Sequence, residues 1–204
     1  MTGKAKVDGQ LPLTLRQRNR LRTRRELLDA ALEVFAESGY GSAGVENIAV
    51  RAGASKVTLY SYFPQGRDEL FRELYEEINT ELIDKVTAVY ADKADFSTHV
   101  VSATAALMEI AERPLVGRFY SIDDPALDEA LTPVRGHASQ VIADLIAKDL
   151  SAPKRIGKAK TKARPRAVAD LLVGAMRSAL GEVARGNATA VDIIEAMKAL
   201  VAHL

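Results

Sequence analysis

The sequence of 204 residues contains no cysteine and no tryptophan, and only 5 % of its residues are aromatic. Without cysteine, a disulfide framework, a thiol nucleophile and a thiolate metal site are all excluded. No stretch approaches the roughly 18 consecutive apolar residues of a membrane span, and the first ten residues lack the apolar centre of a signal peptide. We therefore expect a soluble, cytoplasmic protein that does not enter a membrane.

Motifs typical of enzymes are also lacking. Gly39, Gly41 and Gly44 form G-x-G-x-x-G, the fingerprint of a dinucleotide site, but this pattern follows a predicted helix and lies in no β-α-β unit. None of the three histidines has a glutamate three residues before it or belongs to His-Glu-x-x-His, the two helical metal-binding patterns. We therefore predict no catalytic residue, no metal and no cofactor, and we keep an all-helical enzyme only as a remote alternative.

The net charge of +1 conceals two strongly basic segments. Residues 1–25 contain eight lysines and arginines against one aspartate, and residues 154–166 contain seven with no acidic residue. Because a local basic surface attracts phosphates whatever the net charge, a polyanionic partner such as DNA is compatible with the composition. The first segment could instead only solubilise a loose terminus, and the second is most simply a solvated insertion, so its contact with DNA is left open.

Apolar residues recur at helical spacing along most of the chain, and no segment shows the alternation of a strand. We therefore predict an all-α protein. Residues 1–14 are expected to form a mobile basic tail, and residues 15–66 a small three-helix domain. Residues 67–204 are expected to form a larger helical domain that is interrupted by a basic loop at 151–164.

Residues 45–63 have the pattern of a helix-turn-helix. Gly53 suits the sharp turn after a short amphipathic helix, and Ser55 is placed to cap a second helix. Leu59 and Phe63 fall four residues apart and are predicted to pack inward. The hydroxyls and the lysine on the other faces of this second helix suit phosphate oxygens and base edges in a major groove.

Residues 22–71 resemble the N-terminal DNA-binding domain of TetR-type (tetracycline-repressor-like) transcriptional regulators. The matching motifs are A-x-x-x-F in the first helix, the GY after it, I-A-x-x-A-G, and S-K-x-T-L-Y-x-Y-F. The resemblance implies a regulator with a helical domain that binds a small-molecule effector and dimerises through its last two helices. The expected function is ligand-responsive repression at a palindromic double-stranded operator; the alternative is a low-specificity DNA-binding or chromosome-organising protein.

The resemblance also implies which residues contact DNA. The helix after Ser55 would read base edges and anchor the backbone, and Arg67 would replace the lysine that usually opens the fourth helix. Because Ala43 and Gly44 stand where the family usually has hydroxyl residues, upstream arginines are expected to compensate for a missing phosphate contact. The implied DNA-binding residues are Lys56, Val57, Thr58, Tyr60, Ser61, Tyr62, Arg67, Arg22, Arg24 and Arg25.

Two further sets of residues are predicted in the larger domain. Large or adaptable side chains in its central helices could line an effector pocket or fill the core, and the last two helices carry apolar surface that suggests a homodimer interface. The pocket candidates are Tyr90, Met108, Phe119, Tyr120, His137 and Met176. The interface candidates are Leu172, Met176, Ala179, Ile194, Met197 and Val201.

Overall fold

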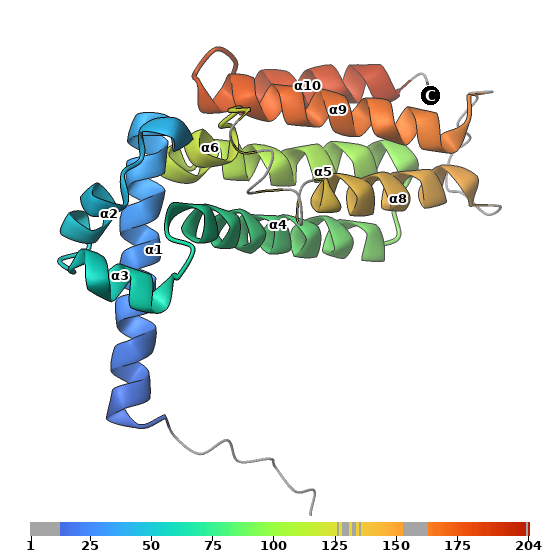
Figure 1. The fold of residues 1–204 in the computed structure, drawn as a ribbon. Coiled ribbons are helices and arrows are strands. Elements are labelled where there is room, and N and C mark those ends of the chain that lie inside the picture. Colours follow the sequence, from blue (N-terminus) through green and yellow to red (C-terminus); the bar gives the residue numbers. More distant parts are fainter. Residues whose placement is uncertain are drawn as a thin grey trace, which may run out of the picture.

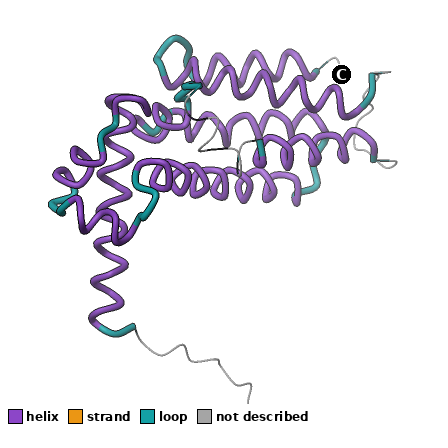
Figure 2. The backbone as a smooth tube through the Cα atoms, viewed as in Figure 1, coloured by secondary structure: helices purple, strands orange, loops and turns teal. Residues whose placement is uncertain are grey.

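A computed structural model describes residues 13–125, 127, 131, 134, 136–152, 163–202 and 204. All regular structure in these residues is helical, which confirms the predicted fold class (Figure 2). None of the described helices is both long and apolar enough to cross a membrane. Most of the predicted tail and of the basic loop at 151–164 lies outside the described residues.

The N-terminal part of the chain contains α1 (Leu15–Ser42), α2 (Val45–Arg51) and α3 (Lys56–Tyr62). Thr14 begins α1 with a capping box: its hydroxyl accepts from the Gln17 backbone N–H at 3.3 Å, and the Gln17 side chain accepts from the Thr14 N–H at 2.8 Å. Gly39 interrupts the helix with a φ of 72°. The arginines between residues 16 and 25 therefore lie on a helix and not on an extended arm.

The two helices of the predicted helix-turn-helix are capped differently. The Ser55 hydroxyl accepts from the Thr58 N–H at 3.0 Å and begins α3, as predicted. The residue before α2 is Gly44, and no side chain caps this helix, so Ser42 does not supply the missing hydroxyl. Leu59 and Phe63 are fully buried, which confirms the predicted inner face of α3.

The rest of the chain forms a helical stack. Its elements are α4 (Arg67–Ala91), α5 (Phe96–Ala111), α6 (Pro114–Tyr120), α8 (His137–Ser151), α9 (Pro165–Ala184) and α10 (Ala190–Val201). In Figure 1 the long helices α4, α5, α8, α9 and α10 run lengthwise, and α1 crosses one end of the stack. The predicted stripe of α4 is buried: Leu70, Leu74, Ile78, Leu82 and Val86.

The sequence predicts Ser97 as the cap of the fifth helix, and this prediction was wrong. Asp95, not Ser97, begins α5, since its Oδ1 accepts from the Thr98 N–H at 2.7 Å. The Ser97 hydroxyl instead donates to the carbonyl of Val201 at 3.3 Å and ties α5 to the end of α10. The helix predicted from residue 134 begins at His137 after the left-handed Gly136, and Thr132 and Pro133 lie outside the described residues.

A cluster of aromatic rings joins α1 to the helical stack. The Phe71 ring of α4 lies 5.0 Å from Phe35, 5.2 Å from Tyr40 and 4.5 Å from Phe119 of α6, between ring centroids. All four side chains are at most 2 % exposed. The beginning of α4 therefore packs with α1 as well as with α6.

Candidate nucleic-acid interface

The outer face of α3 presents the side chains that the resemblance assigns to DNA. Val57 is 80 % exposed and Tyr60 is 41 % exposed, and Lys56 is exposed beside them. These side chains point outward because Leu59, on the opposite face, is fully buried. The short helix is thereby fixed to the core by its apolar side and leaves a lysine, an aliphatic group and a phenol free to enter a groove.

The hydroxyls of α3 have partners within the helix. The Thr58 and Ser55 hydroxyl oxygens lie 2.8 Å apart, and the Ser61 hydroxyl donates to the Thr58 carbonyl at 2.7 Å. The Ser61 proton and one proton of the Ser55–Thr58 pair are thus engaged, but each oxygen retains acceptor capacity. Tyr62 is half-buried, with the Arg20 guanidinium carbon 5.8 Å from its ring centroid.

Arg67 begins α4, as predicted, but its side chain has partners within the chain. Its guanidinium lies over the Tyr40 ring at 4.4 Å and donates to the carbonyls of Tyr40 and Gly41 at 3.3 Å each. The Tyr40 hydroxyl in turn donates to Asp68 at 2.6 Å, and burial, followed by this carboxylate, raises the pKa of Tyr40 to about 12. In this structure Arg67 therefore joins the end of α1 to α4, and a phosphate contact requires it to leave these partners.

Two of the three upstream arginines also serve the fold. Arg24 pairs with Glu73 of α4 through both guanidinium nitrogens and lies 4.8 Å above the Phe63 ring. Arg25 contacts Asp29 at 2.6 Å and Glu77 of α4 at 2.9 Å, and the hydrogen bond with Asp29 is the largest cause of its raised pKa. These two cations connect α1 with α4, so a contact with DNA phosphates would compete with these carboxylates.

The third upstream arginine is more loosely held. Arg22 lies 3.6 Å from Glu26, one turn farther along α1, and both side chains are at least half-exposed. An exposed pair of this kind contributes little to stability. Arg22 is thus available to a phosphate, although it has an acidic neighbour.

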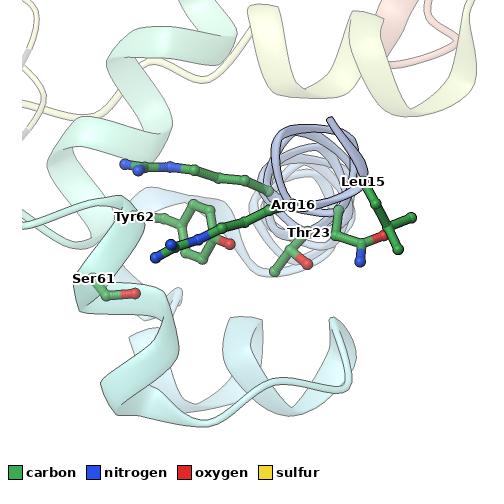
Figure 3. A pocket seen from close by; sticks show the side chains of 7 residues that line it. Leu15, Arg16, Thr23, Ser61 and Tyr62 are labelled. Carbon is green, nitrogen blue, oxygen red and sulfur yellow. The ribbon is translucent and has the colours of Figure 1, made fainter. Parts of the chain in front are cut away.

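The unpaired cations lie earlier on α1 than predicted. Arg16 and Arg20, one turn apart, line a groove of about 740 Å³ between α1 and α3, together with Leu15, Asn19, Thr23, Ser61 and Tyr62. Figure 3 shows the Arg16 side chain extending from α1 toward Tyr62 and Ser61. The spacing of four residues between Arg16 and Arg20 is visible in the sequence. It places the two side chains on one face only if the segment is helical.

Comparison with known proteins agrees with this arrangement. Residues 27–74 match the family model described as bacterial regulatory proteins, tetR family. The chain carries a TetR-type DNA-binding domain. The matched region contains α2, α3, the later part of α1 and the beginning of α4.

Curated relatives match the TetR-type domain and part of the helical stack. The HTH-type transcriptional regulator LuxR of Vibrio harveyi is 30 % identical over 97 residues, which are 46 % of this chain and 45 % of that protein. The HTH-type transcriptional activator FasR of Mycolicibacterium smegmatis is 28 % identical over 131 residues, which are 62 % of this chain and 59 % of that protein. The chain thus spans about half the length of these relatives.

A solved structure shares most of the fold. The transcriptional regulator FadR from Bacillus subtilis, in complex with stearoyl-CoA, superposes with a TM-score of 0.72 at 16 % identity. The superposition covers 88 % of this chain and 98 % of that chain. The TetR-type domain is therefore attached to a helical stack of a known kind.

The six candidate effector residues are distributed over the core and separate recesses in the described part of the chain. Met108, Phe119 and Met176 are at most 1 % exposed and fill the core. The Tyr90 ring lies 4.8 Å from His99, and its hydroxyl is buried without a hydrogen-bond partner among the described residues. Of the two alternatives that the sequence left open, pocket lining or core packing, Met108, Phe119 and Met176 show core packing.

The other two candidates, Tyr120 and His137, lie at separate recesses. His137 lines a recess of about 540 Å³ together with Glu76, Asn79, Thr80, Ile83 and Val134. Tyr120 borders another of about 400 Å³. Its hydroxyl donates to Oδ1 of Asn79 at 2.5 Å, so one hydrogen bond connects residues of the two recesses. Asn79, which is 5 % exposed, was missed because a lone asparagine in an apolar stripe carries no motif.

The predicted interface residues also need revision. Leu172, Met176, Met197 and Val201 are at most 7 % exposed within the single chain, while Ala179 and Ile194 are partly buried. The apolar residues that α9 and α10 expose are others: Leu171, Val191 and Leu200, which are 61–75 % exposed. Helical periodicity identified the apolar face of each helix, but the core of the chain uses most of that face.

Replacing Arg24 by alanine is expected to lower the free energy of unfolding by about 1 kcal/mol, because an ion pair and a cation–π contact between helices are removed. The same change should leave the salt dependence of DNA binding unchanged. Urea denaturation measures the first effect. Arg22→Ala is the matched control with a stability change near zero, since Arg22 has only its exposed contact with Glu26. A loss equal to that of the control would contradict the structural role of Arg24.

Proposed function

We propose that the chain is a ligand-responsive transcriptional regulator that binds a palindromic operator as a homodimer. The observation that carries the proposal is the exposed face of α3, where Lys56, Val57 and Tyr60 project from a helix whose other side is buried. In a dimer, two such helices enter successive major grooves about 34–36 Å apart. Lys56 would contact phosphates or guanine acceptors, and Val57 a thymine methyl group.

The exposed leucines and valine of α9 and α10 support the dimer. Leu171, Val191 and Leu200 lie on the two helices that cover one side of the stack (Figure 1). Burying such side chains against a second copy gains about 1.5–3 kcal/mol for each one that is fully covered. The dimer would place the two TetR-type domains with a fixed separation.

The recess lined by Asn79 and His137 is the proposed effector site. A ligand there lowers operator affinity only by the difference in its affinity for the two dimer geometries. Asn79 receives the hydrogen bond of Tyr120, so a ligand that competes for this amide can displace the Tyr120 side chain beside α6. Because the neighbouring FadR fold is solved with stearoyl-CoA, acyl-CoA thioesters belong among the first ligands to test.

Selection of duplexes from a random-sequence pool, followed by footprinting, tests the proposal. A discrete palindromic footprint is expected, and Lys56→Ala should weaken binding about 10-fold, the loss of one charged hydrogen bond. Val57→Ala should relax the preference at one base pair without abolishing binding. Lys93→Ala, in the exposed connection between α4 and α5, removes the same charge far from α3 and should have no effect.

A second function, low-specificity DNA binding, makes a different prediction in the same experiment. It would give no enriched sequence, and Lys56→Ala would weaken all duplexes equally. The sign of control needs a separate measurement, since one relative, FasR, is described as an activator. A reporter gene behind the selected operator is expected to be repressed by this chain, and increased expression would show activation.

A further inference from the structure

The first helix extends well beyond the part that packs on the DNA-binding core. All residues from Leu15 to Arg22 are exposed, and the first fully buried residue of α1 is Leu27. Figure 1 shows this segment projecting past α3. A solvent-exposed helical extension with a capping box at its start is more ordered than the core requires, which suggests that it has a partner.

We propose that the groove between this extension and α3 holds one sugar–phosphate strand of the bound DNA, with Arg16 and Arg20 as its phosphate-binding residues. The inference rests on the proposed function and deepens it. It makes α1 and α3 two sides of a clamp. The recognition helix would read the major groove while the extension of α1 fixes the adjacent backbone.

The chemistry of the groove fits a phosphodiester strand. Its lining contains two guanidinium groups, three hydroxyls and an amide, and no acidic side chain. Neither Arg16 nor Arg20 makes an ion pair with any described residue, and Arg20 is held only near the Tyr62 ring. Guanidinium groups bind phosphate oxygens with paired hydrogen bonds, and hydroxyl and amide groups commonly complete such contacts.

The arginines along α1 form two groups, one with carboxylate partners and one without such partners among the described residues. The three arginines from 22 to 25 have carboxylate partners, whereas Arg16, Arg18 and Arg20 have none among the described residues. Arg16 and Arg20 share one face because they are four residues apart, and Arg18 lies on the opposite face of the helix. Only the pair that faces α3 is placed to hold a strand that α3 also contacts.

The position of the groove fits a duplex already engaged by α3. Its α3 side is formed by Ser61 and Tyr62, at the end of the recognition helix, and its α1 side runs along two helical turns. A strand between them would border the major groove that Lys56 and Val57 enter. Leu15, Arg16, Asn19 and Arg20 on the α1 side and Ser61 on the α3 side are exposed to solvent, as binding of a strand from outside requires.

The salt dependence of DNA binding tests this clamp. The probes are the strongest duplex that the wild-type protein selects from a random pool and a mixed-sequence duplex. For the double variant R16A/R20A, the slope of log affinity against log salt should fall by about 0.9 for each phosphate that is no longer neutralised, or roughly 3.5 in a dimer. Affinity for both duplexes should drop about 10-fold or more at fixed salt.

Matched variants make the result specific. R18A removes one charge from the opposite face and should change the slope by less than R16A alone, although both remove the same charge from the same helix. R16K/R20K keeps the charge and should retain most of the slope. Circular dichroism of each variant checks that α1 remains helical. Hydroxyl-radical footprinting of the wild type should show a protected backbone segment beside the major-groove contact, and this protection should be absent with R16A/R20A.

The outcomes separate the clamp from the proposed function. If the wild type binds its selected duplex but R16A/R20A leaves the slope unchanged or matches R18A, the clamp is wrong and the regulator remains. If the wild type selects no duplex but R16A/R20A still flattens the slope on mixed sequence, the specific operator is wrong and the clamp remains. A change in oligomeric state on R16A/R20A, by sedimentation, would show that a second copy occupies the groove.

Discussion

Replacing Phe71 by alanine is expected to lower the free energy of unfolding by about 3–5 kcal/mol. The Phe71 ring is 1 % exposed and contacts aromatic rings of α1 and α6 at centroid distances of 4.5–5.2 Å. Alanine would leave a cavity that these rings cannot fill without moving their helices. Urea denaturation followed by circular dichroism measures the loss.

A conservative variant tests whether the loss of stability comes from the cavity or from any substitution of Phe71. Phe71→Leu keeps most of the volume and should cost less than half as much as alanine. Because Phe71 joins α4 to both Phe35 and Phe119, the alanine variant should also weaken operator binding under conditions where it is still folded. A loss of stability below 1 kcal/mol would show that the cluster closes around the missing ring.

Replacing Gly117 by alanine is the second change expected to have a large effect. A Cβ at this position would lie 2.1 Å from the carbonyl oxygen of Ala111, at the end of α5. Since the clashing atom belongs to the backbone, no side chain can rotate away, and α6 must shift against α5. Overpacking of this kind costs about 1–3 kcal/mol or more. Thermal unfolding should show a clear fall in melting temperature.

At a second helical glycine, replacement by alanine is expected to raise the stability instead of lowering it. Gly174 lies on the exposed side of α9, and a Cβ there would meet no atom within 4 Å. Gly174→Ala should therefore stabilise the isolated subunit by about 0.5–1 kcal/mol through helix propensity alone. Destabilisation in both variants would indicate that helix α9 is covered by a second copy and that space at Gly174 is used there.

The helix-turn-helix was predictable because its signals are local. The glycine turn after α2, the Ser55 cap and the inward Leu59 and Phe63 depend on residues within a few positions of one another, and the structure has all of them. The stripe along α4 was predictable for the same reason. Neither needs knowledge of what the helix packs against.

The partners of the arginines could not be predicted where they lie far away in the sequence. Arg24 and Arg25 lie 49 and 52 residues before the glutamates that they bind, and only the Arg25–Asp29 pair, one helical turn apart, leaves a local signal. The sequence also left open whether the alternating arginines belong to a helix or to an arm. The capping box of Thr14 and Gln17 resolves this locally, and only then do Arg16 and Arg20 share a face.

The sequence by itself determined that this protein is all-α and that a helix-turn-helix pattern lies at residues 45–63, because periodicity and caps act over one or two helical turns. The tertiary structure decided which residues remain free to act. It buried most of the predicted interface and pocket side chains, engaged Arg24, Arg25 and Arg67, and left Arg16 and Arg20 facing α3. Whether a side chain is free to bind a partner depends on contacts between segments far apart in the chain. These contacts form only when the helices pack.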